Sequence, residues 1–264
     1  MMEIEIIQKT FLRTSRIEHP IGHIWFIHPF GESGLCYKEA FHSRLVEKFN
    51  LYVPDLPGFG ASPNYGRART MEELVSCLVG LIDEISAHAN LFIVAHSVSG
   101  LIGTELCKHY KDKVKGFISV EGNLLEIDSY YSSLPINHSE NDFHKIYTDS
   151  VFEKAASRID FRRYLSSIYF AEIDSLVQWG KSTEKYISGD KPGVEFMHLT
   201  CPKRYVWGDK DTPAETQEFI EKNRIPNIYF EGIGHWPMIE VPEKFYNAVG
   251  DFFSKTTLEY SASE

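Results

Sequence analysis

Two patterns of hydrophobic and polar residues follow one another along the chain. Short continuous apolar runs at 23–27, 91–95 and 114–120 are typical of strands that are buried on both faces of a parallel sheet. Between such runs, apolar residues recur every three or four positions, which is the spacing of an amphipathic helix. Strands that alternate with helices predict an α/β fold, in which a mostly parallel sheet is flanked by helices.

The same pattern predicts the bounds of the elements. Strands are expected at 3–18, 23–27, 51–53, 91–95, 114–120, 203–207 and 227–230, and the candidate inward positions of the first are Ile4, Ile6, Phe11 and Leu12. Helices are expected at 37–49, around 71–85, from the turn after 97 up to 110, at 215–222 and around 245–252.

Residues 124–198 have a different character. They are richer in polar and aromatic residues, and they indicate helices around 143–157, 161–173 and 176–187. We therefore expect an α/β core of residues 1–123 and 199–264, with a helical lid at 124–198 inserted after the strand that ends near Glu121. Open α/β sheets place their sites at the carboxyl ends of the strands, which is where this insertion would lie.

Ser97 follows the apolar run 91–95 and precedes a segment with helical spacing. Small residues, Ala95 and Ser99, stand two places before it and two places after it. This pattern is typical of a nucleophile elbow, a turn so tight that bulky side chains at those positions would clash with neighbouring backbone. A serine that caps an ordinary helix has the same local pattern. Ser97 is therefore a candidate nucleophile.

Composition excludes several classes of protein. The chain has 264 residues, 43% of them hydrophobic, which suits one large domain or a domain with an insertion. A net charge of −10 and the lack of a long Lys/Arg run argue against nucleic-acid and anionic-membrane partners. No apolar run is long enough to span a bilayer, and no signal-peptide pattern is present. The scattered cysteines are typical of reduced thiols, so we expect a cytoplasmic protein: Cys36, Cys77, Cys107 and Cys201.

Four motifs in chain order resemble those of the α/β-hydrolase family, and the likeness spans essentially the whole chain. They are the loop His28-Pro29-Phe30-Gly31, the run Asp55-Leu56-Pro57-Gly58-Phe59-Gly60-Ala61-Ser62, the elbow at Ser97, and Trp207-Gly208-Asp209-Lys210-Asp211 followed by Gly234-His235-Trp236. Nucleophile, acid and histidine thus follow one another in the order of this family.

The resemblance implies a catalytic triad. Ser97 would be the nucleophile, His235 the general base, and Asp211 the acid that orients the imidazole. Asp211 also has the chemistry of a turn residue, and His235 that of a packed loop histidine. Glu121 ends the strand that follows the elbow helix, where some relatives carry the acid, and it is the alternative to Asp211.

The resemblance also implies an oxyanion hole. The backbone N–H of Val98 would be one donor and that of Phe30 the second. Pro29 departs from the glycine that is usual in this loop. Because proline has no N–H and a fixed φ, the loop is expected to differ in shape.

A serine at the elbow, where related dehalogenases and epoxide hydrolases carry a carboxylate, predicts hydrolysis of small-molecule carboxylic esters through an acyl-enzyme. No cofactor and no metal are implied. The alternatives are a thioester, amide or C–C bond as the scissile bond, and a small-molecule receptor of the same fold. Aromatic residues of the lid would line an acyl pocket or pack the lid on the core: Tyr130, Tyr131, Phe143, Tyr147, Phe152, Tyr164, Tyr169 and Phe170.

A cluster of cations in the lid suggests a further partner. The four residues recur at near-helical spacing in an otherwise acidic protein: Lys154, Arg158, Arg162 and Arg163. Such a patch would suit an acidic acyl carrier protein, and some relatives cleave esters of carrier-bound acyl chains. Asp160 lies among them, and a solvated helix face is the simpler interpretation.

Overall fold

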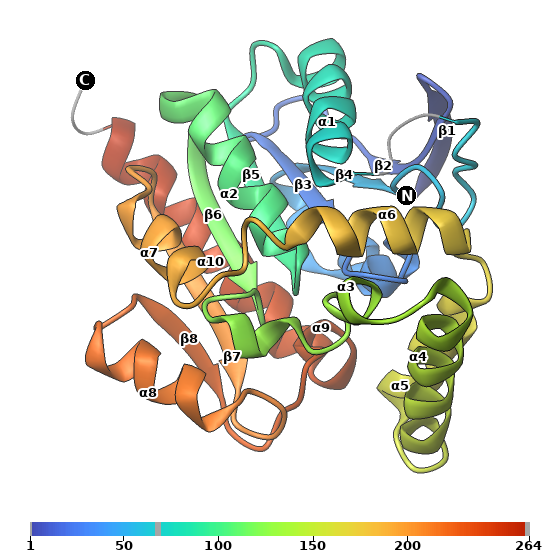
Figure 1. Ribbon diagram of the computed structural model, residues 1–264. Coiled ribbons are helices and arrows are strands. Elements are labelled where there is room, and N and C mark those ends of the chain that lie inside the picture. Colours follow the sequence, from blue (N-terminus) through green and yellow to red (C-terminus); the bar gives the residue numbers. More distant parts are fainter. Residues whose placement is uncertain (1, 67–69, 262–264) are drawn as a thin grey trace.

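The structure is a computed structural model that describes residues 2–66 and 70–261. Its centre is an eight-stranded sheet in the order β1-β2-β4-β3-β5-β6-β7-β8 (Figure 1). The strands are β1 (Glu3–Ile7), β2 (Thr10–Ser15), β3 (His23–Ile27), β4 (Asn50–Pro54), β5 (Leu91–His96), β6 (Val114–Val120), β7 (Lys203–Gly208) and β8 (Asn227–Phe230). In this order, every neighbouring pair from β4–β3 to β7–β8 is parallel, whereas the pairs β1–β2 and β2–β4 are antiparallel. This confirms the mostly parallel sheet.

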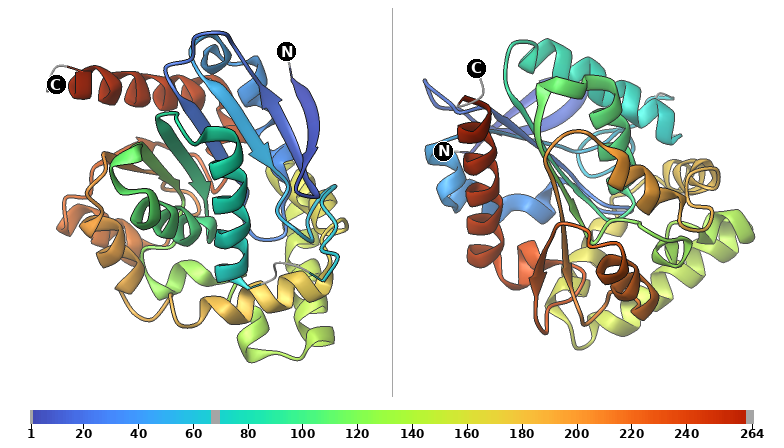
Figure 2. Two further views of the ribbon diagram at one scale, coloured as in Figure 1. Left: turned by 90° about the horizontal axis from the view of Figure 1, so that it is seen from above. Right: turned by 90° about the vertical axis from the view of Figure 1, so that its left-hand side faces the viewer.

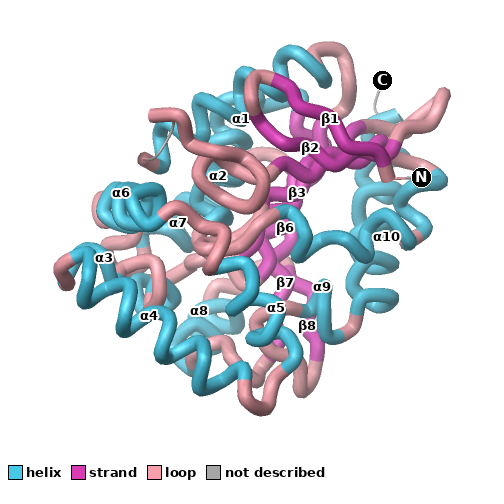
Figure 3. The backbone as a smooth tube through the Cα atoms, turned by 90° about the vertical axis from the view of Figure 1, so that its right-hand side faces the viewer, coloured by secondary structure: helices cyan, strands magenta, loops and turns pink. Residues whose placement is uncertain are grey.

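Helices cover both faces of this sheet. In Figure 3, α1 (Met71–Ser86) and α2 (Ser99–Tyr110) lie on one side of the strands and α10 (Pro242–Ser261) on the other, and Figure 2 shows the same arrangement from above. Neighbouring residues of β6 explain the packing, because successive side chains of a strand point to opposite faces. Gly116 leaves room for Phe253 of α10, and Phe117 packs against Gly103 of α2.

Two predictions for the N-terminal part are wrong. Instead of one strand at 3–18, residues 3–15 form a hairpin of two strands, turned at Gln8 and Lys9, which have positive φ. Ile4 and Ile6 are 57% and 74% exposed, because the side chains of β1 that turn toward the core are those of the alternate residues, among them Ile7. Leu12 is buried, as predicted.

The helix predicted at 37–49 is instead two 3₁₀ helices, η1 (Gly34–His42) and η2 (Arg44–Glu47). Ser43 separates them. Its hydroxyl donates to the carbonyl oxygen of Ala40 and accepts the N–H of Leu45, so it ends one helix and begins the next.

Residues 124–198, which we call the helical insertion, connect β6 to β7. They contain η4 (Glu126–Ser129), α3 (Leu134–Asn137), α4 (Glu140–Ala155), α5 (Ile159–Ile168), α6 (Ile173–Thr183) and α7 (Lys191–His198). The helices α4 and α5 lie side by side (Figure 1). The remaining helices, α8 (Ala214–Lys222) and α9 (Pro237–Glu240), belong to the C-terminal part. That the insertion is a separate lid domain stays a prediction.

Candidate active site

Ser97 lies on a strained turn between β5 and α2. Its φ is 56°, a left-handed conformation that is uncommon for residues other than glycine. The N–H of Ser97 donates to the carbonyl oxygen of Val120 on the neighbouring strand at 2.8 Å. A Cβ on Gly100 would lie 3.2 Å from the Cα of Gly122, so the backbone comes close here. The strand, turn and helix together hold the Ser97 side chain at the carboxyl end of the sheet.

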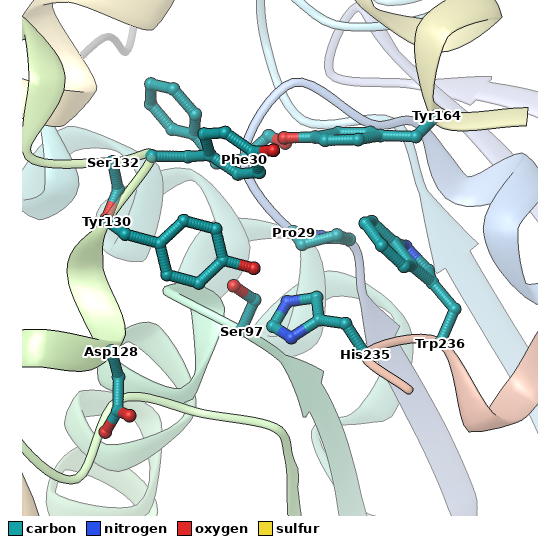
Figure 4. Close-up of a pocket in the computed structure, with 10 residues that line it drawn as sticks. Pro29, Phe30, Ser97, Asp128, Tyr130, Ser132, Tyr164, His235 and Trp236 are labelled. Atoms are coloured by element: carbon teal, nitrogen blue, oxygen red, sulfur yellow. The ribbon is translucent and has the colours of Figure 1, made fainter. Parts of the chain in front are cut away.

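Ser97 and His235 line the same small cavity. Figure 4 shows the Ser97 side chain beside the His235 ring, with its hydroxyl pointing toward the hydroxyl of Tyr130. Tyr130 and Tyr164 come from the helical insertion, and Trp236 closes another side. The cavity has a volume of about 20 Å³, which is room for about one water molecule. An acyl group therefore needs these side chains to move.

Two carboxylates approach His235 from neighbouring strands. Glu121 Oε2 lies 3.7 Å from Nδ1 of the ring, and both side chains are buried. Asp211 Oδ2 accepts the backbone N–H of His235 at 2.9 Å. In the part of the chain that the structure describes, it is therefore Glu121 whose carboxylate lies within 4.0 Å of the imidazole, and the two form an ion pair when His235 is protonated.

The carboxylate of Asp211 is also bound by a cation of the insertion. Arg158 donates to Asp211 Oδ1 at 2.7 Å and to Oδ2 at 2.6 Å, and to Asp160 Oδ2 at 2.5 Å. Burial by itself would raise the pKa of Asp211, but the hydrogen bonds from Arg158 and from the His235 backbone outweigh it and lower this pKa. Asp211 is thus a charged group that joins the insertion to the loop of His235.

The loop predicted to hold the oxyanion is fixed from both sides. Its His28 carbonyl oxygen accepts the Ser99 hydroxyl at 2.6 Å, and burial lowers the pKa of His28 to about 4, so this imidazole is neutral at pH 7. The Phe30 carbonyl oxygen accepts the Tyr164 hydroxyl at 2.8 Å. Val98 stands at the start of α2, where helix N–H groups lack an intrahelical acceptor. The roles of Phe30 and Val98 as oxyanion donors stay predictions.

The four cations of the insertion all have partners within the chain. Arg158 binds Asp160 and Asp211, as described above. Arg163 pairs with Glu39 at 2.8 Å. The remaining two are exposed: Lys154 donates to the Tyr131 hydroxyl at 3.1 Å, and Arg162 donates to the carbonyl oxygen of Ala155 at 2.9 Å. The structure thus gives Arg158 a position near the candidate site, and the others a place on the helices of the insertion.

Sequence reasoning missed two contributors to the site. Arg158 was expected at the surface, and nothing in the local pattern relates it to Asp211, 53 positions away. Thr212 was not singled out, yet its hydroxyl lies 2.8 Å from Glu121 Oε2. A threonine directly after the predicted acid was a weak signal at best.

An α/β sheet with a serine on a strained turn after a parallel strand, and a histidine from a later loop that lines the same cavity, is the arrangement of an α/β hydrolase. The chain belongs to that family: residues 26–248 match the profile described as "Alpha/beta hydrolase family". Within the described residues, no helix combines the length and apolar character needed to cross a membrane.

Curated relatives include esterases. The chain is 22% identical over 262 residues to a pimeloyl-[acyl-carrier protein] methyl ester esterase of Photorhabdus laumondii, which covers 88% of this chain and 92% of that protein. It is 25% identical over 234 residues to Lipase 1 of Psychrobacter immobilis, with 81% of this chain and 71% of the lipase covered.

Solved structures show the same fold. A variant of the N-acyl homoserine lactonase AidH complexed with N-hexanoyl homoserine is similar with a TM-score of 0.77 and 16% identity, over 97% of this chain and 98% of that one. A thermophilic esterase from Thermogutta terrifontis has a TM-score of 0.72 and 18% identity, over 97% and 99% of the two chains. At these identities the likeness concerns the fold alone.

Proposed function

We propose that this α/β hydrolase cleaves carboxylic esters through an acyl-enzyme formed on Ser97. The observation that carries the proposal is the pair of side chains in the small cavity: Ser97, held on a strained turn, lies beside the His235 ring. A serine hydroxyl is a weak nucleophile by itself and needs a base within reach. Its relatives among the esterases support the ester as the bond that is cleaved.

The reaction follows from these positions. Ser97 Oγ attacks the carbonyl carbon of the ester while its proton passes to His235, and the carbonyl oxygen becomes an oxyanion that accepts the N–H groups of Val98 and Phe30. The C–O bond to the leaving group breaks, and His235 returns the proton to the alcohol. A water molecule then repeats the sequence on the acyl-enzyme, which releases the acid and restores Ser97. A carboxylate near His235 stabilises the imidazolium in both halves.

Turnover of p-nitrophenyl acetate and labelling by a fluorophosphonate test this proposal. We expect the wild-type protein to turn over the ester and to be labelled at Ser97, and Ser97→Ala to lose both. Ser166→Ala is the matched control, because Ser166 is an exposed serine of α5 that should keep wild-type rates. A wild-type protein that binds the ester without hydrolysing it would instead be a receptor of this fold. Faster turnover of the matching thioester or amide would show that the enzyme prefers that bond to the ester.

A second candidate substrate is an ester whose acyl chain is bound to an acyl carrier protein. The observation that favours it is the similarity, over 88% of this chain, to a pimeloyl-[acyl-carrier protein] methyl ester esterase. Of the four clustered cations, the exposed Lys154 and Arg162 are the two without an acidic partner among the described ion pairs. They are the surface that such an acidic carrier would meet.

The two substrates are distinguished by one comparison. If the carrier is a partner, kcat/KM for the carrier-bound methyl ester exceeds that for the methyl ester of the same acid without the carrier. Replacing both Lys154 and Arg162 by Glu removes the difference. Equal values in the wild-type protein would leave small-molecule esters as the substrate. A cytoplasmic location stays a prediction.

A further inference from the structure

Two carboxylates contact different parts of His235. Glu121 Oε2 is 3.7 Å from Nδ1 of the ring, whereas Asp211 accepts the backbone N–H. We propose that Glu121 is the acid that orients the His235 ring and stabilises its positive charge, and that Asp211, paired with Arg158, ties the histidine loop to the helical insertion. This inference rests on the proposed ester hydrolysis by Ser97 and His235.

The backbone presents Glu121 to the ring. Glu121 directly follows β6, the strand next to the one that carries Ser97, and its φ is 47°. A glutamate in the left-handed region is strained by about 1 kcal/mol or more, and such strain clusters at functional sites. Its N–H donates to the carbonyl oxygen of Val206 at 2.8 Å, so the strained residue is held in the sheet. The turn directs a long acidic side chain toward the end of β7.

The Glu121 carboxylate is buried and fixed. The N–H of Gly208 donates to Oε1 at 2.7 Å, and the Thr212 hydroxyl lies 2.8 Å from Oε2. Among the described residues, His235 is the one group able to carry a positive charge within 4.0 Å of it. A buried carboxylate of this kind gains a partner when the imidazole takes the Ser97 proton, so its charge acts at the step where it is needed.

The negative charge of Asp211 is already paired with a cation, Arg158. Both oxygens of Asp211 accept from the Arg158 guanidinium, and Oδ2 also accepts the His235 backbone N–H. The Arg158 cation therefore offsets part of the field of Asp211 at the ring, although Asp211 and His235 still interact electrostatically. Asp160, which is buried, shares the same guanidinium. These contacts stabilise the loop of His235, whereas Glu121 is the carboxylate that lies within 4.0 Å of the His235 ring.

The other groups around the ring are uncharged or apolar. Burial lowers the pKa of His96 well below its ordinary value, so this neighbouring imidazole is neutral. Burial raises the pKa of Tyr130, which faces the ring from the insertion, so its hydroxyl keeps its proton. Trp236 packs edge-on against the ring. Changes in the protonation of His235 between variants will thus report on Glu121 and Asp211.

Glu121→Gln and Asp211→Asn test the proposal, because each removes one charge with little change of shape. We expect E121Q to lower kcat/KM for p-nitrophenyl acetate by about 100-fold or more, since loss of a triad carboxylate costs up to about 10⁴-fold. The acidic limb of its kcat/KM–pH profile should move to lower pH, because the imidazolium has lost its anion. D211N should lower Tm and reduce kcat/KM by less than about 10-fold. The acidic limb of its kcat/KM–pH profile should stay at the wild-type pH.

Two further variants keep the comparison sharp. Glu121→Asp retains the charge one methylene further away and should recover part of the activity lost in E121Q, which a purely structural defect would not allow. Asp251→Asn removes a charge from an exposed residue of α10 and should behave as wild type. The reverse result, in which D211N shows the large loss and the displaced limb while E121Q shows neither, would overturn the proposal.

The ring signals of His235 in an NMR pH titration give the same comparison without turnover. They should change at lower pH in E121Q than in the wild-type protein, and at the wild-type pH in D211N. If the wild-type protein hydrolyses no ester, the proposed function fails, and the NMR comparison still decides which carboxylate acts on the ring. If hydrolysis is present and both variants titrate alike, the inference about Glu121 fails by itself.

Discussion

The imidazole of His96 donates a hydrogen bond from Nε2 to the carbonyl oxygen of His235 across 2.7 Å. His96 directly precedes Ser97 and is buried. Burial, and then the nearby His235 ring, keep the pKa of His96 well below its ordinary value, so the ring is neutral and has one N–H to donate. The residue before the nucleophile thus holds the loop of the base.

Replacing His96 by Ala should cost both stability and activity. The buried carbonyl oxygen of His235 loses its donor, which costs about 1–3 kcal/mol, and the deleted ring leaves a cavity. A displaced His235 should lower kcat/KM by about 10-fold or more, since small misplacements of catalytic groups are costly. Urea denaturation and esterase kinetics measure the two effects. His88→Ala, at an exposed histidine, is the control. Equal free energies of unfolding for the two variants would contradict the prediction.

Tyr130 separates the cavity over Ser97 from a larger one. It lines the small cavity of about 20 Å³ and also a neighbouring cavity of about 550 Å³ formed by the insertion. Tyr130→Ala should join the two spaces, and the ratio of kcat/KM for p-nitrophenyl hexanoate to that for the acetate should rise about 10-fold, because each buried methylene adds to binding. Tyr169→Ala, at a tyrosine of the insertion that is 71% exposed, should leave the ratio unchanged. An unchanged ratio in both variants would place the acyl group elsewhere.

Glu32 makes stability depend on pH. Burial raises the pKa of its carboxyl to about 7, although hydrogen bonds from Ser167 and from the backbone of Ser33 partly oppose this. A folded-state pKa above the unfolded value of about 4.3 gives stability that is complete below pH 4.3 and is lost as the pH rises through 7. Glu32→Gln removes this dependence, so relative to wild type it should gain up to about 3 kcal/mol between pH 4 and pH 8.

Denaturation of wild type and Glu32→Gln at both pH values measures that gain. Glu39→Gln is the comparison variant, since Glu39 is a partly exposed glutamate that pairs with Arg163. A wild-type protein whose stability follows that of Glu32→Gln at every pH would show that Glu32 ionises normally in the folded state.

Arg158 joins the insertion to the core through Asp160 and Asp211. Arg158→Met leaves two carboxylates without their cation and should lower the free energy of unfolding by about 3 kcal/mol at pH 7. The pKa of Asp211 is lowered in the fold. Its contribution to the free energy of unfolding is therefore complete above about pH 3.9 and is lost as the pH falls through the lowered pKa. Thermal unfolding measures the loss. Arg162→Met, which removes bonds to backbone carbonyls alone, should cost less than about 1 kcal/mol, and similar losses would contradict a special role for Arg158.

The sequence by itself determined the sheet and the turn that carries Ser97. Buried parallel strands need nearly continuous apolar runs, so β3, β5 and β6 were found close to their true bounds. Local pattern failed where neighbours in space decide which face of a strand is covered: in β1 the alternate residue Ile7 packs against the core, and Ile6 is exposed.

Only the tertiary structure decided which carboxylate meets the ring of His235. The sequence placed Asp211 and Glu121 at the ends of two neighbouring strands, and the family motif favoured Asp211 as the acid. The contacts that distinguish them join residues far apart in the chain: Arg158 with Asp211, and Gly208 with Glu121. Electrostatic interactions depend on distances of a few ångströms between such groups, and strand order fixes the edge of the sheet but not those distances.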